Sequence, residues 1–190
     1  FHENPYIVMP IEFIGDPLLL FTHAANKIAL YGPFWIGLTN TPYLAGFGNF
    51  LLTLFSFKLF IVLFYLGITF LLWKMTKNLF SVSLFALNPL VIIETLVSSH
   101  NDIVMMFLAL ISFFFLQKKK ILLAILFVTF SILIKYATVF LIPIFLYTLF
   151  RTIKKEKIDW QKIFMISFFS MMIIFLLSAF REEIYPWYGI

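Results

Sequence analysis

The sequence predicts an all-α polytopic transmembrane helical bundle, and we expect the chain to be a fragment of a longer protein. Of its 190 residues, 63% are hydrophobic, 21% are aromatic and only 12% are charged, a composition outside the usual range of soluble domains. Apolar runs recur along the chain with polar residues between them. Because a helix satisfies its own backbone hydrogen bonds in lipid, such runs favour helices that cross a membrane.

The first 43 residues are expected to form an external loop with short helices. They hold most of the Pro and Gly turn signals and two of the three histidines, a pattern typical of irregular aqueous segments. Residues 44–190 are expected to form the transmembrane bundle. This bundle is expected to be incomplete at both ends, because the chain starts at Phe1 without an initiator Met or a signal-type segment and stops just after a polar cluster.

The bundle is expected to be built from successive apolar runs. These are Phe57–Trp73, Leu79–Ile93, Ile103–Leu116, Ile121–Ile134, Ala137–Phe150 and Ile163–Phe180, with Leu44–Phe55 as a half-length element. Most are shorter than the roughly 20 residues that cross a bilayer, so either polar flanks lie at the interfaces or helices end at a water-filled vestibule. Residues 121–150 as one helix would span roughly 45 Å, so Lys135-Tyr136 is predicted to be a corner between two helices.

Charged residues are distributed unevenly between the loops. If the helices cross alternately, ten of the fourteen Lys and Arg residues fall on one side. They are Lys74, Lys77, Lys118, Lys119, Lys120, Arg151, Lys154, Lys155, Lys157 and Lys162. Short cytoplasmic loops are rich in Lys and Arg, so this side is predicted to be cytoplasmic. The external (periplasmic or extracellular) side receives seven of the nine acids and all three histidines. The protein is therefore expected in the cell membrane, with its functional site on the external face.

The tripeptide His100-Asn101-Asp102 is the main candidate for chemistry. Asp102 could bind a divalent ion or orient a substrate, or Asn101 and Asp102 could simply cap the following helix. His100 could relay a proton or bind phosphate, because imidazole titrates near neutral pH, or it could be a solvated interfacial residue. Glu94 ends an apolar run, where an acid is costly in lipid and is a functional candidate; the alternative is an interface carboxylate.

Cations and aromatic residues on the external side are the candidates for substrate binding. Lys135 and Arg181 could bind a phosphate, or Lys135 could snorkel to the interface and Arg181 could pair with its acidic neighbours. Aromatic residues could stack on a sugar or form an interfacial belt. The candidates are Tyr31, Tyr136, Trp187 and Tyr188. Lys58 is expected to snorkel, and Asn88-Pro89 is expected to bend or break a helix.

Composition also excludes several partners and cofactors. The net charge of +5 is explained by membrane side, so membrane lipid rather than nucleic acid is the expected partner. Cysteine is absent and the three histidines show no ligand spacing, so no metal site is predicted, although a divalent cation as cofactor is left open. The chain contains no Gly-rich phosphate motif, and an external site has no access to cytosolic nucleotides, so a membrane-borne donor is expected.

Several short motifs together resemble one family. The segment Leu87-Asn88-Pro89-Leu90, followed by Glu94 and Ser99-His100-Asn101-Asp102, resembles the Asn-Pro-Leu and His-Asn-Asp segments of multi-pass glycosyltransferases of the C fold (GT-C). Similar pieces occur in the same order across the chain. They are Asn4-Pro5-Tyr6, Tyr31-Gly32-Pro33 with Trp35, Leu133-Ile134-Lys135-Tyr136 and Tyr185-Pro186-Trp187-Tyr188. Within that fold, the chain resembles the polyprenyl- or dolichyl-phosphate-mannose-dependent mannosyltransferases.

This resemblance implies an integral membrane glycosyltransferase. It would transfer a hexose, mannose in most relatives, from a polyprenyl-phosphate-sugar donor to a glycan or lipid-linked acceptor on the external face. The family's catalytic acid usually precedes the Asn-Pro-Tyr segment, so the general base is expected upstream of this sequence, and its role is not transferred to Glu3, Glu12 or Asp16. Direct displacement needs this base and cations that stabilise the departing phosphate.

Three other classes fit parts of the sequence. A lipid or solute transporter, such as a flippase, would also contain broken helices and a few buried charges, but its polar residues are expected near the midplane, together with paired repeats. An external-face acyltransferase or ligase would depend on a different lipid donor. A non-catalytic assembly subunit is the third alternative.

Overall fold

The computed structural model describes residues 4–16, 19, 22, 25–154 and 168, and within them every regular element is helical. The all-α prediction is confirmed for this part of the chain. The chain divides into two compact units between Tyr31 and Gly32, and each is considered by itself. In the first unit a short turn, η1 (Pro10–Glu12), lies in an irregular segment, and Ala29 N donates to Pro5 O over 2.8 Å.

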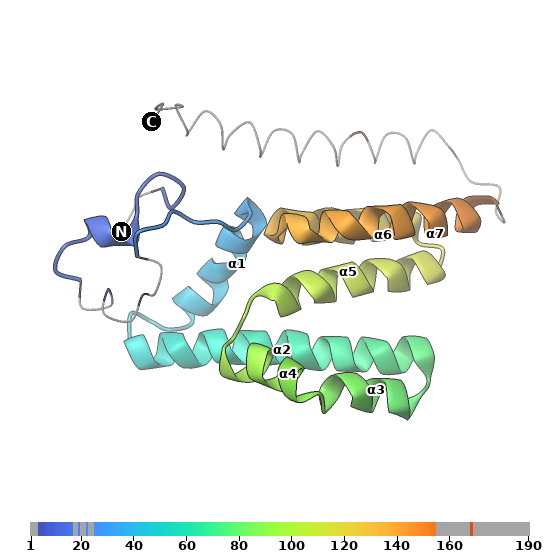
Figure 1. Cartoon of the computed structure of the whole chain (residues 1–190), viewed down its shortest axis with the longest axis horizontal. Coiled ribbons are helices and arrows are strands. Elements are labelled where there is room, and N and C mark those ends of the chain that lie inside the picture. The colour runs from blue at the N-terminus through green and yellow to red at the C-terminus, as the bar shows by residue number, and fades with distance from the viewer. Residues whose placement is uncertain (1–3, 17–18, 20–21, 23–24, 155–167, 169–190) are drawn as a thin grey trace. The chain divides into compact units, whose positions relative to one another are not determined.

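The second unit contains the helices that carry the site. They are α1 (Pro33–Leu44), α2 (Phe50–Thr76), α3 (Leu79–Ala86), α4 (Pro89–Ile92), the π-helix η3 (Ile93–Val97), α5 (Asp102–Gln117), α6 (Ile121–Ile134), the 3-10 segment η4 (Tyr136–Leu141) and α7 (Ile142–Lys154). In Figure 1, α2, α5 and α6 lie side by side, and α3 and α4 run along α2.

Helix α2 is the element that suits a membrane best. Asn49 begins it by accepting a hydrogen bond from Leu52 N, and Lys77 ends it in the left-handed conformation. Among the described residues, α2 is the single helix long and apolar enough to cross a membrane, and the bent pair α3 and α4–η3 would make a second span. Large apolar side chains along α2, such as Leu59, Leu63 and Phe70, are exposed, as expected for a surface that faces lipid.

The predicted break at Asn88-Pro89 is confirmed, because the helix axis bends by 51° there. Proline has no N–H to donate, and Leu90 N donates to the Asn88 side chain instead of the backbone. This leaves the Ala86 carbonyl without its helical partner. The Tyr65 hydroxyl of α2 donates to that carbonyl, so a hydrogen bond connects the break to α2.

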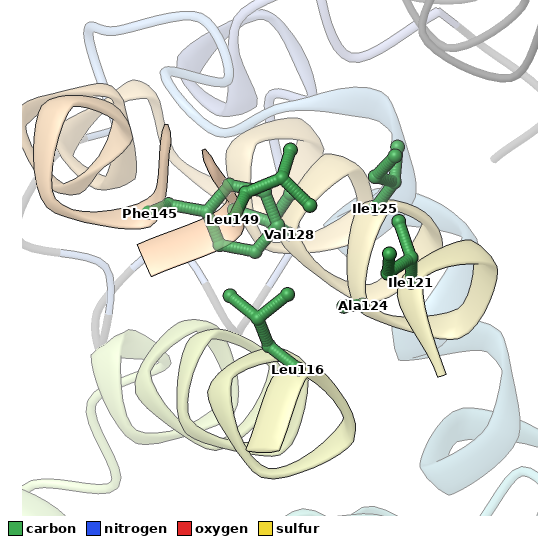
Figure 2. Packing of buried hydrophobic residues seen from close by; sticks show 7 residues of the cluster. All are labelled: Leu116, Ile121, Ala124, Ile125, Val128, Phe145 and Leu149. Carbon is green, nitrogen blue, oxygen red and sulfur yellow. The ribbon is translucent and has the colours of Figure 1, made fainter. Parts of the chain in front are cut away.

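Two apolar clusters hold the helices together. In one, Ile61 of α2, Ile103 of α5 and Ile134 of α6 are buried against each other with their neighbours. The other joins Leu116 of α5 to the first half of α6 and to Phe145 and Leu149 of α7, as Figure 2 shows. Since α5 and α6 both contribute to each cluster, these two helices form the centre of the unit.

The structure changes some of the expected boundaries. Residues 50–55 are the first turns of α2, so the predicted half-length element Leu44–Phe55 is wrong. Run 137–150 is divided into η4 and α7. Pro42 lies inside α1, so the predicted limit of the N-terminal segment at residue 43 falls in the last turn of this helix. Run 163–180 lies outside the described residues except for Phe168.

Candidate functional site

The polar residues of the site sit just beyond the isoleucine cluster, at one end of the second unit. Asp102 immediately precedes Ile103, Lys135 immediately follows Ile134, and Lys58 lies one helical turn before Ile61. Residues three apart on a helix share a face. Packing of the three isoleucines therefore brings three charged residues from α2, α5 and the α6–η4 corner to the same end, which we call the polar end.

Asp102 and Lys135 form an ion pair at this end. Lys135 Nζ lies 2.7 Å from Asp102 Oδ1, and both side chains are 42% exposed. Asp102 is the first residue of α5, where the helix dipole favours a carboxylate. The sequence did not indicate this pairing, and the predicted substrate roles of both residues stay predictions. The pair engages the Oδ1 atom of Asp102.

Lys135 is held in place by buried hydroxyl groups on either side of the corner. The Ser131 hydroxyl donates to Met105 O of α5 over 2.8 Å and lies 2.8 Å from the Thr138 hydroxyl of η4. Both hydroxyl residues are buried. The corner is thus fixed to α5 three residues after Asp102, and the predicted helix break at Lys135-Tyr136 is confirmed.

Gly32 locks the start of α1 onto the same corner. Its N–H donates to Ile134 O over 2.9 Å, and a Cβ added at this position would overlap the carbonyl oxygen of Leu133. Backbone dihedral angles do not require glycine here, because φ is −69°. Close packing against the end of α6 requires it, which explains the Tyr31-Gly32-Pro33 motif physically.

Glu94 and His100 form a second polar contact at this end. Glu94 lies in the π-helix and His100 in the loop before α5, and His100 Nε2 is 3.3 Å from Glu94 Oε2. His100 N also donates to Glu94 O over 3.1 Å. Single turns of π-helix occur often at functional sites, and this one directs the Glu94 side chain toward the His100-Asn101-Asp102 segment.

Lys58 is a site residue that sequence reasoning missed. It was expected to snorkel, but Lys58 Nζ donates to Val97 O over 2.8 Å and lies 3.5 Å from Ser99 Oγ. A lysine commonly binds the unpaired carbonyls at a helix end. The sequence signal for this contact was weak, consisting of a single cation near the start of an apolar run.

Asn101 is buried, with 6% of its surface exposed, and its Nδ2 has no hydrogen-bond partner within the described chain. Its side chain does not cap α5, so the predicted capping role is wrong for this residue. Leaving a buried amide donor without a partner costs roughly 1–3 kcal/mol. This cost favours a role for Asn101 other than helix capping.

The opposite end of the same helices carries the basic loops. Lys74 and Lys118 both lie over the Phe114 ring, at 5.3 Å and 5.9 Å from its centroid. Lys119 and Arg151 line one cavity of about 180 Å³. The described cations of the set predicted to share one side thus gather at one end, which we call the basic end. Helix α5 separates it from the polar end by roughly 24 Å. Lys155, Lys157 and Lys162 lie outside the described residues.

The remaining candidates are placed as follows. Tyr136 begins η4, next to Lys135, and is exposed. Tyr31 belongs to the first unit, where its carbonyl accepts a hydrogen bond from the Tyr6 hydroxyl over 2.8 Å. Arg181, Trp187 and Tyr188 lie outside the described residues. No group of three His, Asp or Glu side chains that could hold a metal ion occurs among the residues that the structure describes.

Comparison with known protein families gives one match. Residues 2–151 match the N-terminal domain of the alpha-(1->6)-mannopyranosyltransferase family, known as the MptA/B family. The match covers most of the chain, so the chain belongs to this family, and the prediction of a glycosyltransferase is confirmed, with mannose as the transferred sugar. Neither the curated proteins nor the solved structures gave a match. Together with the membrane-spanning properties of α2, the family indicates a membrane location.

Proposed function

We propose that this protein is a multi-pass GT-C glycosyltransferase that transfers mannose from a polyprenyl-phosphate carrier to a 6-hydroxyl of a glycan or lipid-linked acceptor. The family description supplies the α-(1→6) linkage. The observation that carries the proposal is the Asp102–Lys135 ion pair at 2.7 Å, placed beside the Glu94–His100 contact at the polar end. This end lies away from the basic loops, which are expected to face the cytoplasm.

The proposed reaction is a single displacement at the anomeric carbon. The acceptor oxygen forms a bond to this carbon while the bond to the phosphate oxygen breaks, and the electron pair stays on the phosphate. A general base removes the proton of the acceptor hydroxyl. On the resemblance to the polyprenyl-phosphate-dependent enzymes, this base is proposed to lie upstream of the Asn4-Pro5-Tyr6 segment.

The polar end supplies binding and orientation in this proposal. Asp102 Oδ2 accepts a hydrogen bond from a sugar hydroxyl, while Lys135 keeps Oδ1 in place. Asn101 and His100 donate to substrate oxygens, and Glu94 orients His100. Contacts with the sugar or the lipid chain are proposed for four aromatic residues, Tyr31, Tyr136, Trp187 and Tyr188. Arg181 is proposed to bind the phosphate.

The donor can be tested directly with the full-length protein in membranes. We expect transfer of labelled mannose from polyprenyl-phosphate-mannose and none from a nucleotide-linked mannose. Asp102→Asn should lower transfer by roughly tenfold to a hundredfold, because a hydrogen bond to a charged group contributes about 1.5–3 kcal/mol. Transfer from the nucleotide donor alone would refute the lipid-carrier proposal.

Lys118→Gln, at the basic end, is the matched control and should transfer at the wild-type rate. Equal losses of mannose transfer in Asp102→Asn and Lys118→Gln would show that the polar end has no specific role in the reaction.

A further inference from the structure

Lys58 differs from Lys135 in how its charge is compensated. Lys135 pairs with the Asp102 carboxylate, whereas the partners of Lys58 are a neutral carbonyl and a neutral hydroxyl. In the described part of the second unit the acids are Glu94 and Asp102, and they pair with His100 and Lys135 respectively. Within the described part of the second unit, the charge of Lys58 therefore has no carboxylate partner.

The surroundings make this charge costly unless an anion approaches. Lys58 is half-buried at the start of the membrane-capable helix α2, and an ionisable residue within an apolar span is expensive and points to function. Its contacts with Val97 O and Ser99 Oγ hold the ammonium beside the loop that leads into Asp102. An ammonium has three N–H donors, so a donor remains for a further oxygen.

We propose that Lys58 binds a phosphate oxygen of the lipid carrier. This inference rests on the proposed function and adds a binding residue that the sequence did not indicate. During transfer the sugar phosphodiester, with one negative charge, becomes a monoester with nearly two. A cation that no carboxylate neutralises stabilises this extra charge, so Lys58 favours the departing phosphate as well as donor binding.

Binding of the carrier itself tests the inference without requiring sugar transfer. Affinities of the full-length protein for a polyprenyl monophosphate and for the polyprenol of equal length would be compared in lipid nanodiscs. The wild type should prefer the phosphate, and Lys58→Gln should reduce this preference by roughly tenfold or more, the scale of a hydrogen bond to a charged group. Lys58→Arg should retain most of it.

The glutamine variant keeps a donor for Val97 O, so the loop retains its anchor while the charge is lost. Lys74→Gln removes a cation from the other end of α2 and should leave the preference unchanged. A wild type without preference for the phosphate would overturn the inference, as would a Lys58→Gln variant that keeps the full preference or loses affinity for phosphate and alcohol equally.

The two proposals can fail separately. If the wild type transfers mannose from the lipid carrier while Lys58→Gln binds the phosphate normally, the proposed function stands and the role of Lys58 is wrong. If the phosphate preference depends on Lys58 but no mannose is transferred from this carrier, the anion site stands and the donor assignment is wrong.

Discussion

The polar end and the basic end of the second unit hold their cations in different ways. At the polar end Lys135 pairs with a carboxylate and Lys58 binds a backbone carbonyl, so each ammonium has a directional partner. At the basic end Lys74, Lys77 and Lys118 lie over aromatic rings at 4.2–5.9 Å. Among the described residues of the second unit, no carboxylate lies at the basic end.

The function of the lysines at the polar end is expected to depend on their position, whereas the lysines at the basic end need only carry a positive charge there. A cation over an aromatic face gains roughly 0.5–1 kcal/mol when exposed and tolerates displacement, so such a lysine needs no fixed position. A paired cation between helices fixes two elements relative to each other. We therefore expect substitutions at the polar end to affect transfer and those at the basic end to affect it little.

Exchanging the charges of the ion pair should give the largest effect. Asp102→Lys and Lys135→Asp alone each place like charges together. Each should lower mannose transfer by roughly a hundredfold, the scale of a misplaced positioning group, and the unfolding free energy by about 1 kcal/mol, since the pair is partly exposed. The double variant should recover part of the stability, because a lysine at the first position of α5 opposes the helix dipole. Transfer assays and unfolding in mixed micelles measure the two quantities.

The double variant should not recover transfer, because its carboxylate projects from the corner instead of from α5. Recovery of wild-type transfer would mean that the ion pair only stabilises the packing of α5 against the α6–η4 corner. Lys118→Glu, a charge reversal at the basic end, provides the comparison and should leave transfer unchanged.

Gly32→Ala should give the next largest effect, because the added methyl group overlaps the Leu133 carbonyl at the end of α6. Either α1 or the Lys135 corner must move, and we expect a loss of about 2–3 kcal/mol in the free energy of unfolding. Gly37→Ala is the matched control on the same helix, where the new Cβ meets no atom within 4 Å. Helix propensity predicts that it stabilises α1 by up to about 1 kcal/mol. Equal effects of the two substitutions on unfolding would contradict the packing role of Gly32.

Much of the local structure could be predicted from the sequence, because it depends on neighbouring residues. The run 121–134 matches α6, and the breaks at Asn88-Pro89 and at Lys135 follow from proline chemistry and from helix length. The grouping of the basic loops at one end followed from the distribution of charge. The π-helix Ile93–Val97 was not predicted, because all of it except Ile93 lies beyond the apolar run 79–93.

The contacts that shape the site could not be predicted, because they join residues far apart in the chain. Lys58 is separated from Val97 by 39 residues, and Ser131 from Met105 by 26. Nothing near Ser131 in the sequence distinguishes it from an ordinary small residue inside an apolar helix. Its importance depends on the crossing of α5 and α6, which brings the Met105 carbonyl within reach.

Phe114→Leu should give the smallest effect and tests the basic end. Leucine keeps an apolar side chain next to Phe115 but removes the ring shared by the Lys74 and Lys118 ammonium groups. We expect the unfolding free energy to fall by about 1 kcal/mol, the combined scale of exposed cation–π contacts, with mannose transfer unchanged. Both lysines keep their charge in this variant. A large loss of transfer in this variant would mean that the basic end takes part in the reaction, and the contrast between the two ends would then fail.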